Sequence, residues 1–221
     1  MEKIRINALI YSLILFLTSA GGCSGPFKQA NITANEFYRS PLLKDIGNSR
    51  IGFLTTAVSR ERGLSEYRVG VSDIIEKAFR KEKPEIVIIS SRETINSINN
   101  AALTDIYASM LNYYDVTGIL NKNYLKKIGD ALEVQYIAQP RLLSFVETTT
   151  IRLSALGLSI ISTRETTVKL SLQLWDTLTG NIVWEASGQA TVAVEAMRAT
   201  PVTFEEVAEA VSLAVVKKIP F

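Results

Sequence analysis

The 221-residue chain contains no histidine and only one cysteine. Without histidine it lacks the side chain that most often serves as general base, proton shuttle or zinc ligand, and a Ser-His-Asp triad is excluded. One cysteine excludes an intrachain disulfide and any metal site built from several cysteines. The 24 Lys and Arg nearly balance the 22 Asp and Glu, for a net charge of +2. This gives little electrostatic reason to expect nucleic acid as a partner.

The sequence also lacks a glycine-rich phosphate loop, a GxSxG motif and any metal-ligand spacing. Glu165, between Arg164 and Lys169, is typical of the charge pattern of a strand edge. Residues 90–93 (SSRE) follow an apolar strand, where open α/β sheets often place ligand contacts, but they are more typical of a helix N-cap. We therefore predict no catalytic residue, no metal and no cofactor. A hydrolase with a Ser-Lys or paired-carboxylate site is the third-ranked alternative.

The first 23 residues have the layout of a secretory signal. Lys3 and Arg5 form a basic start, an apolar run follows from Ile6 to Leu17, and small residues then lead to Cys23. The apolar run is shorter than the roughly 20 residues of a transmembrane helix. Small residues followed by cysteine resemble the lipobox of bacterial lipoproteins, although Ala20 stands where that family usually has leucine.

In bacterial lipoproteins the signal is removed, and the cysteine becomes the acylated first residue, with palmitate among its chains. The resemblance implies a signal peptide over residues 1–22 and a bilayer anchor at Cys23. Ser24 rather than aspartate follows, which in enterobacterial lipoproteins favours the periplasmic face of the outer membrane. The alternative is an ordinary signal peptide or anchor helix followed by an incidental cysteine.

Residues 24–49 mix proline, glycine, asparagine and serine without sustained periodicity. They predict a linker, with a short ordered piece near Phe37 to Leu43. Residues 23–49 are thus expected to be a lipidated N-terminus and tether, and residues 50–221 to be one periplasmic domain.

Within residues 50–221, strand and helix patterns alternate. Apolar runs and period-2 alternation predict strands at 51–54, 86–89, 136–146, 168–175 and from 182 onward. Helical periodicity predicts helices at 67–79, 103–114, 124–132 and 203–215. The run 86–89 is expected to be buried on both faces. The order β-α-β-α-α-β-β-β-α describes an α/β (α+β) domain, a mixed sheet of about five strands packed with helices.

Asp176 to Asn181 predicts a hairpin turn, because it holds the Gly and Asn that tolerate positive φ. The two tryptophans that flank this turn either contact a partner or pack across the strands. The apolar stretch 151–162 either continues the sheet, contacts another subunit or touches a membrane. The candidate partner-binding residues are therefore Trp175, Trp184, Leu156 and Leu158.

Two segments resemble the curli-secretion (CsgG-like) superfamily. Residues 125–142 (LKKIGDALEVQYIAQPRL) are similar to its helix-to-strand joint, and residues 170–185 (LSLQLWDTLTGNIVWE) to its Thr-Gly hairpin. The same domain occurs in penicillin-binding-protein activator lipoproteins and is similar to the amino-terminal domain of TolB. Membership implies a periplasmic domain without an active site. It would act by contact with envelope proteins, as adaptor, assembly factor or regulator.

The alternative function is an oligomeric outer-membrane secretion component, which makes a homo-oligomer possible. The curli channel sends two long hairpins per subunit into the membrane, and each transmembrane strand needs about 9–11 residues. In this sequence the segment near 147–166 is the only candidate hairpin, which weakens the pore interpretation.

Overall fold

The computed structural model describes residues 27–43, 46–59, 63–155, 158–196 and 202–220. The predicted signal peptide 1–22 and Cys23 lie outside these residues. In the described part, a seven-stranded mixed sheet has the order β1-β7-β6-β5-β2-β4, and β3 pairs with β5. The strands are β1 (Phe27–Arg39), β2 (Arg50–Phe53), β3 (Ala57–Val58), β4 (Val87–Ile89), β5 (Tyr136–Ala155), β6 (Leu158–Asp176) and β7 (Ile182–Ala196).

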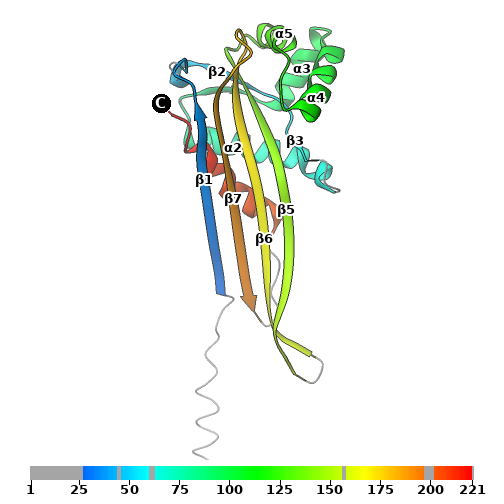
Figure 1. Cartoon of the computed structure of the whole chain (residues 1–221), viewed down its shortest axis with the longest axis vertical. Coiled ribbons are helices and arrows are strands. Elements are labelled where there is room, and N and C mark those ends of the chain that lie inside the picture. Colours follow the sequence, from blue (N-terminus) through cyan, green and yellow to red (C-terminus); the bar gives the residue numbers. More distant parts are fainter. Residues whose placement is uncertain (1–26, 44–45, 60–62, 156–157, 197–201, 221) are drawn as a thin grey trace, which may run out of the picture.

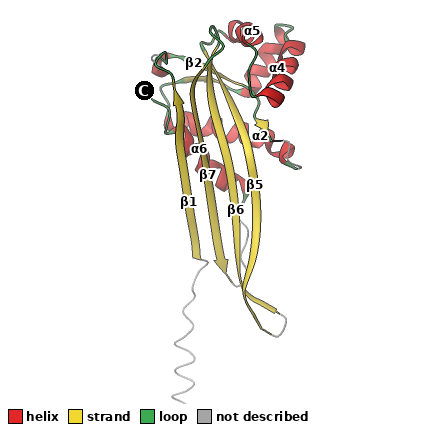
Figure 2. Cartoon of the chain, viewed as in Figure 1, coloured by secondary structure: helices red, strands yellow, loops and turns green. Residues whose placement is uncertain are grey.

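The helices lie on both faces of this sheet. They are α2 (Arg68–Glu82), α3 (Ser91–Asn100), α4 (Thr104–Thr117), α5 (Lys122–Leu132) and α6 (Phe204–Val216), with short 3-10 turns at Ile46–Asn48 and Leu64–Tyr67. As Figure 1 shows, α2 and α6 lie against one face, while α3, α4 and α5 gather at one end of the molecule. From that end, strands β1, β7, β6 and β5 extend toward the opposite end of the molecule as a long antiparallel sheet (Figure 2).

Two hydrophobic cores correspond to the two helical layers. One joins α2 and α6 to the sheet and contains Phe79, Trp184 and Val211, each fully buried. The other lies under α3, α4 and α5 and contains Met110 and Leu125. The predicted fold class, a mixed sheet packed with helices, is confirmed, with seven strands instead of about five. The described residues also hold α3, a helix that the periodicity does not predict.

The prediction of a linker is wrong for Phe27–Arg39, which form β1. This strand pairs antiparallel with β7 from Phe27↔Glu195 to Arg39↔Trp184. Only Ala34 among its residues is even partly buried, so β1 lacks the apolar face by which strands are usually found in a sequence. A weak period-2 signal exists in its small apolar positions, Ala30, Ile32 and Ala34.

Three further predictions concern β4, the stretch 151–162 and the turn at 176–181. Strand β4 ends the sheet order, and the Val87 side chain is 58% exposed, so burial on both faces is wrong. The described residues of the stretch 151–162 continue the sheet, because β5 and β6 stay paired as far as Ala155↔Leu158. The hairpin turn at 176–181 is confirmed, with Gly180 at φ +73°.

Candidate functional site

The two tryptophans beside the hairpin turn are core residues of different cores. Trp184 belongs to the α2 and α6 core, is fully buried, and donates its indole N–H to Glu36 Oε2 at 3.0 Å. Trp175 belongs to the other core and donates to Gln173 Oε1 at 3.2 Å. In the register Trp184 lies opposite Leu174, and Trp175 opposite Ile182. The two indoles therefore pack into separate cores and not on each other. A partner contact through Trp175 or Trp184 stays a prediction.

The other two candidate residues lie at the far end of the β5–β6 hairpin. Leu156 is outside the described residues. Leu158 begins β6 opposite Ala155, and the structure describes its backbone only. A partner contact through these two leucines stays a prediction.

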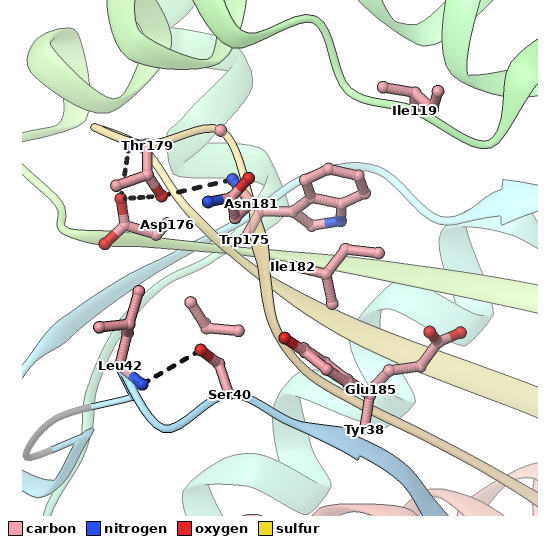
Figure 3. A pocket seen from close by; sticks show the side chains of 12 residues that line it. Tyr38, Ser40, Leu42, Ile119, Trp175, Asp176, Thr179, Asn181, Ile182 and Glu185 are labelled. Atoms are coloured by element: carbon pink, nitrogen blue, oxygen red, sulfur yellow. Dashed lines mark hydrogen bonds between the residues drawn. The ribbon is translucent and has the colours of Figure 1, made fainter.

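A cavity of about 520 Å³ lies beside the hairpin turn (Figure 3). Its walls come from the end of β1 and the residues after it, from the loop after α4, and from the turn itself; they include Tyr38, Leu42, Ile119, Trp175, Asp176 and Glu185. Leu42 and Ile119 expose more than half of their surface, and the two carboxylates lie among these apolar groups. This mixture suits the side chain of a bound protein, because pockets that anchor a partner combine apolar walls with a few polar groups.

The turn that forms one wall of this cavity is held by its own side chains. Asp176 Oδ1 accepts hydrogen bonds from the backbone N–H groups of Leu178 and Thr179, at 3.0 and 2.7 Å, and from the Thr179 hydroxyl at 2.9 Å. Gly180 packs against Lys122, where an added Cβ would lie 2.7 Å from the lysine Cβ. The turn is therefore a rigid support rather than an adaptable loop.

The long sheet has an unpaired edge on each side within the described residues. β1 pairs with β7 on one side only. β5 pairs with β2 through Tyr136 to Ala138 and with β3 through Arg141 and Leu142, and beyond these residues it pairs with β6 alone. Rows of free N–H and C=O groups at a strand edge are a template for pairing with another chain. The sequence predicts neither free edge, because it predicts a linker where β1 lies.

The face of the long sheet that points away from α6 is polar, and beyond the part beside α4 no described helix covers it. Thr167 and Thr191 share a hydrogen bond of 2.9 Å across this face. Alternation along the strands places many hydroxyl and amide groups beside them, including Gln29, Asn31 and Thr33 on β1, Ser187 and Gln189 on β7, Ser171 and Gln173 on β6, and Thr148 on β5. This face offers hydrogen bonds rather than an apolar surface.

Residues 90–93 have the structural role of a helix cap. The Ser90 hydroxyl accepts from the Glu93 N–H at 3.2 Å, and Glu93 Oε2 accepts from the Ser90 N–H at 2.7 Å, a capping box at the start of α3. The hydrogen bonds from the Ser90 side chain and backbone hold the pKa of Glu93 below its ordinary value. This carboxylate is committed to the helix rather than to a ligand.

No group of three or more His, Cys, Asp or Glu side chains among the described residues is placed to hold a metal ion. None of the helices in the described ranges is long and apolar enough to cross a membrane.

Comparisons with known proteins give structural likeness only. No protein-family model and no curated protein matches the chain. The PelC dodecamer from Paraburkholderia phytofirmans is 12% identical, with a TM-score of 0.47 over 86% of this chain and 96% of the other. Lipoprotein GNA1162 from Neisseria meningitidis is 12% identical, with a TM-score of 0.41 over 69% and 87%. The LpoB C-terminal domain from Salmonella enterica is 11% identical, with a TM-score of 0.39 over 66% and 84%. These similarities show neither a family nor a function for this chain, and membership of the curli-secretion class stays a prediction.

Proposed function

We propose that this chain is a lipid-anchored, non-catalytic protein of the bacterial cell envelope that acts by protein contact, as an adaptor, assembly factor or regulator. The observation that carries the proposal is β1, a 13-residue strand with one edge unpaired within the described part of the chain. Natural proteins usually shorten, cover or charge such edges. Between its ends, residues 29–35 (QANITAN) hold no charged side chain, so this edge is open to a partner strand.

Contact through a strand edge takes its affinity from backbone hydrogen bonds and its specificity from the alternating side chains. The cavity of about 520 Å³ lies at the carboxyl end of β1, where Tyr38 forms part of its wall. A partner strand that pairs with β1 can therefore place an apolar side chain in this cavity. The anchor at Cys23 would hold the protein at the membrane where such partners assemble.

One specific observation favours the second candidate function, an oligomeric secretion component. The expectation of a single long hairpin is too narrow, because β5, β6, β7 and β1 are 20, 19, 15 and 13 residues long and lie side by side. β1 and β5 run in opposite directions at the two edges. The β1 edge of one copy can therefore continue the antiparallel sheet at the β5 edge of the next, a head-to-tail contact that generates a ring when its rotation closes.

The experiment places a photo-crosslinking amino acid at Asn31 on β1, at Thr148 on β5, or at the exposed control position Lys77 on α2, in the full-length protein in cells. We expect protein adducts from positions 31 and 148 and far fewer from position 77. Adducts with a different envelope protein support the adaptor function. Adducts with a second copy, together with a large native mass in mild detergent, support the oligomeric function. Equal yields of crosslinked adducts at positions 31, 148 and 77 would overturn the proposal that contact occurs through the strand edges.

A pair of proline variants tests the edge itself. Successive residues of a strand direct their N–H groups to opposite sides, so one of Asn31→Pro and Ile32→Pro removes a donor to β7 and the other a donor at the free edge. The variant that keeps the wild-type unfolding midpoint is the one that lost its donor at the free edge. It should no longer form crosslinked adducts, either with the partner protein or, through position 148, with a second copy. Unchanged adducts in that variant would contradict the proposal.

A further inference from the structure

A second cavity, of about 290 Å³, lies on the uncovered face of the long sheet, beside α4. Six of its lining residues define what we name the bulge cavity: Phe37, Arg141, Leu143, Lys169, Ser171 and Gln173. The register of β1 shifts between Glu36 and Tyr38, and that of β5 shifts between Leu142 and Ser144. The extra residues are Phe37 and Leu143. Bulges re-aim side chains and occur next to functional sites, and here the bulges of both outer strands contribute a wall to one cavity.

The bulge cavity holds two cations without a carboxylate partner. Arg141 and Lys169 make no ion pair with any described residue, although Glu185 also lines the cavity. Arg141 Nε is buried, and no described residue accepts a hydrogen bond from it. An anionic ligand in the cavity would contact Arg141 through its other guanidinium nitrogens. Guanidinium and ammonium groups together suit an anionic oxygen group such as a carboxylate.

The remaining polar groups are preorganised. Gln173 Oε1 accepts from the Tyr114 hydroxyl at 2.9 Å and from the Trp175 indole at 3.2 Å, and its amide nitrogen donates to Glu185 Oε1 at 3.1 Å. Burial raises the pKa of Tyr114 to about 12, so its hydroxyl remains a donor at neutral pH. These contacts join α4, β6 and β7 and hold the Gln173 amide in one orientation.

The chemistry around the two cations suits a sugar better than a peptide. Ser171 and Ser187 lie opposite each other on β6 and β7 and present hydroxyl groups to the cavity. Phe37 lies at the rim of the cavity and is 66% exposed. A sugar has an apolar C–H face that packs on an aromatic ring and a rim of hydroxyls that pair with serine and amide groups.

We propose that the bulge cavity binds an acidic sugar, a uronic-acid unit of a glycan. Its carboxylate lies on Arg141 and Lys169, its ring against Phe37, and its hydroxyls on Ser171 and Ser187. This site lies on the face of the sheet and uses side chains rather than the backbone groups of the strand edges, so it does not depend on the proposed function.

The test is calorimetric titration of the full-length protein in mild detergent at low salt, with trigalacturonate, neutral galactotriose and the peptide Glu-Glu-Glu as probes. We expect trigalacturonate to bind at least about 10-fold more tightly than either of the others. Lys169→Gln and Arg141→Gln should each weaken its binding about 10-fold or more, because each removes a charge-assisted hydrogen bond. Lys126→Gln removes the same charge from an exposed residue of α5 that pairs with Asp130, and it should leave binding unchanged.

Lys169 is exposed, so Lys169→Gln decides the question even if Arg141→Gln fails to fold, which its thermal unfolding reveals. Three results would each overturn the proposal. They are no measurable binding of trigalacturonate, binding that Lys169→Gln leaves unchanged, and binding of Glu-Glu-Glu that equals or exceeds that of trigalacturonate.

Discussion

At the residue scale, Gly188 shows how closely three elements approach one another. A Cβ at this position would lie 2.8 Å from the Thr33 carbonyl oxygen on β1 and 2.8 Å from Val215 Cγ2 on α6. Real Cβ contacts are longer, so β1, β7 and α6 pack at this point only because residue 188 has no side chain. The packing of α6 on the long sheet depends on one missing methyl group.

Gly188→Ala should therefore lower the free energy of unfolding by about 1–3 kcal/mol, because a backbone oxygen and a core valine must move. Urea unfolding followed by tryptophan fluorescence measures this change. Gly70→Ala is the matched control, since it lies inside α2 with no atom within 4 Å of its added Cβ. Alanine there should raise stability by up to about 1 kcal/mol. Equal shifts in both variants would contradict the close approach at Gly188.

At the element scale, β1 is held by side chains as well as by its ladder. Lys28 pairs with Glu206 at the start of α6. Near the other end, Glu36 accepts from the buried Trp184 indole and pairs with Arg39 at 2.7 Å. The Arg39 hydrogen bond, with that of Trp184 adding to it, holds the pKa of Glu36 below its ordinary value of 4.5. A strand with almost no buried side chain is thus tied to the surface of α6 near one end and to a core tryptophan near the other.

Glu36→Gln tests this tie through its pH dependence. A carboxyl with a lowered folded-state pKa adds stability that is present above the unfolded value and is lost as pH falls through the folded value. At pH 7 the free energy of unfolding of the wild type should exceed that of Glu36→Gln by about 0.5–1 kcal/mol. The difference is small because the Glu36–Arg39 pair is partly exposed. The difference should disappear on acidification below pH 4.5.

The control for this titration is Glu209→Gln, which changes an exposed carboxylate of α6 that makes no ion pair with a described residue. It should show no comparable difference at either pH. A Glu36→Gln difference that persists undiminished at pH 3 would show that the charge of Glu36 is not what ties β1 to Trp184.

At the scale of the whole molecule, α3, α4 and α5 lie at one end, and the long strands extend from there toward the other end (Figure 1). β1 starts at the end remote from α3, α4 and α5, the same end at which the β5–β6 hairpin closes. Cys23 precedes Phe27 by only four residues, a reach of at most about 14 Å. An anchor at Cys23 would therefore place the bilayer near the closed end of this hairpin, and the helical layer away from the membrane.

The anchor itself is tested by Cys23→Ala combined with a signal that is cleaved without lipidation. The wild type should fractionate with membranes and yield an acylated N-terminal peptide by mass spectrometry. The variant should appear in the soluble periplasmic fraction, because it has lost its acyl chains. Membrane association of the correctly cleaved variant would contradict the lipid anchor.

The sequence pattern predicted an element correctly wherever the residues that determine the element are close together in the chain. Helices α2, α4, α5 and α6 and the turn at 176–181 all follow from neighbours in the chain. Apolar composition likewise identified Trp175 and Trp184 as residues of interest. It could not place them in different cores, because that depends on the register of β6 against β7.

The remaining features arise from contacts between distant residues. β1 is a strand because β7, about 150 residues away, supplies its hydrogen bonds, although its own side chains stay exposed. Phe37 and Leu143 share a cavity because two register shifts occur on strands that the sheet order brings together. The sequence alone therefore specified helices α2, α4, α5 and α6 and the turn, while the lipobox-like motif at Cys23 stays a prediction. Only the tertiary structure decided the free edges and the bulge cavity, since hydrogen-bond register is a property of paired strands.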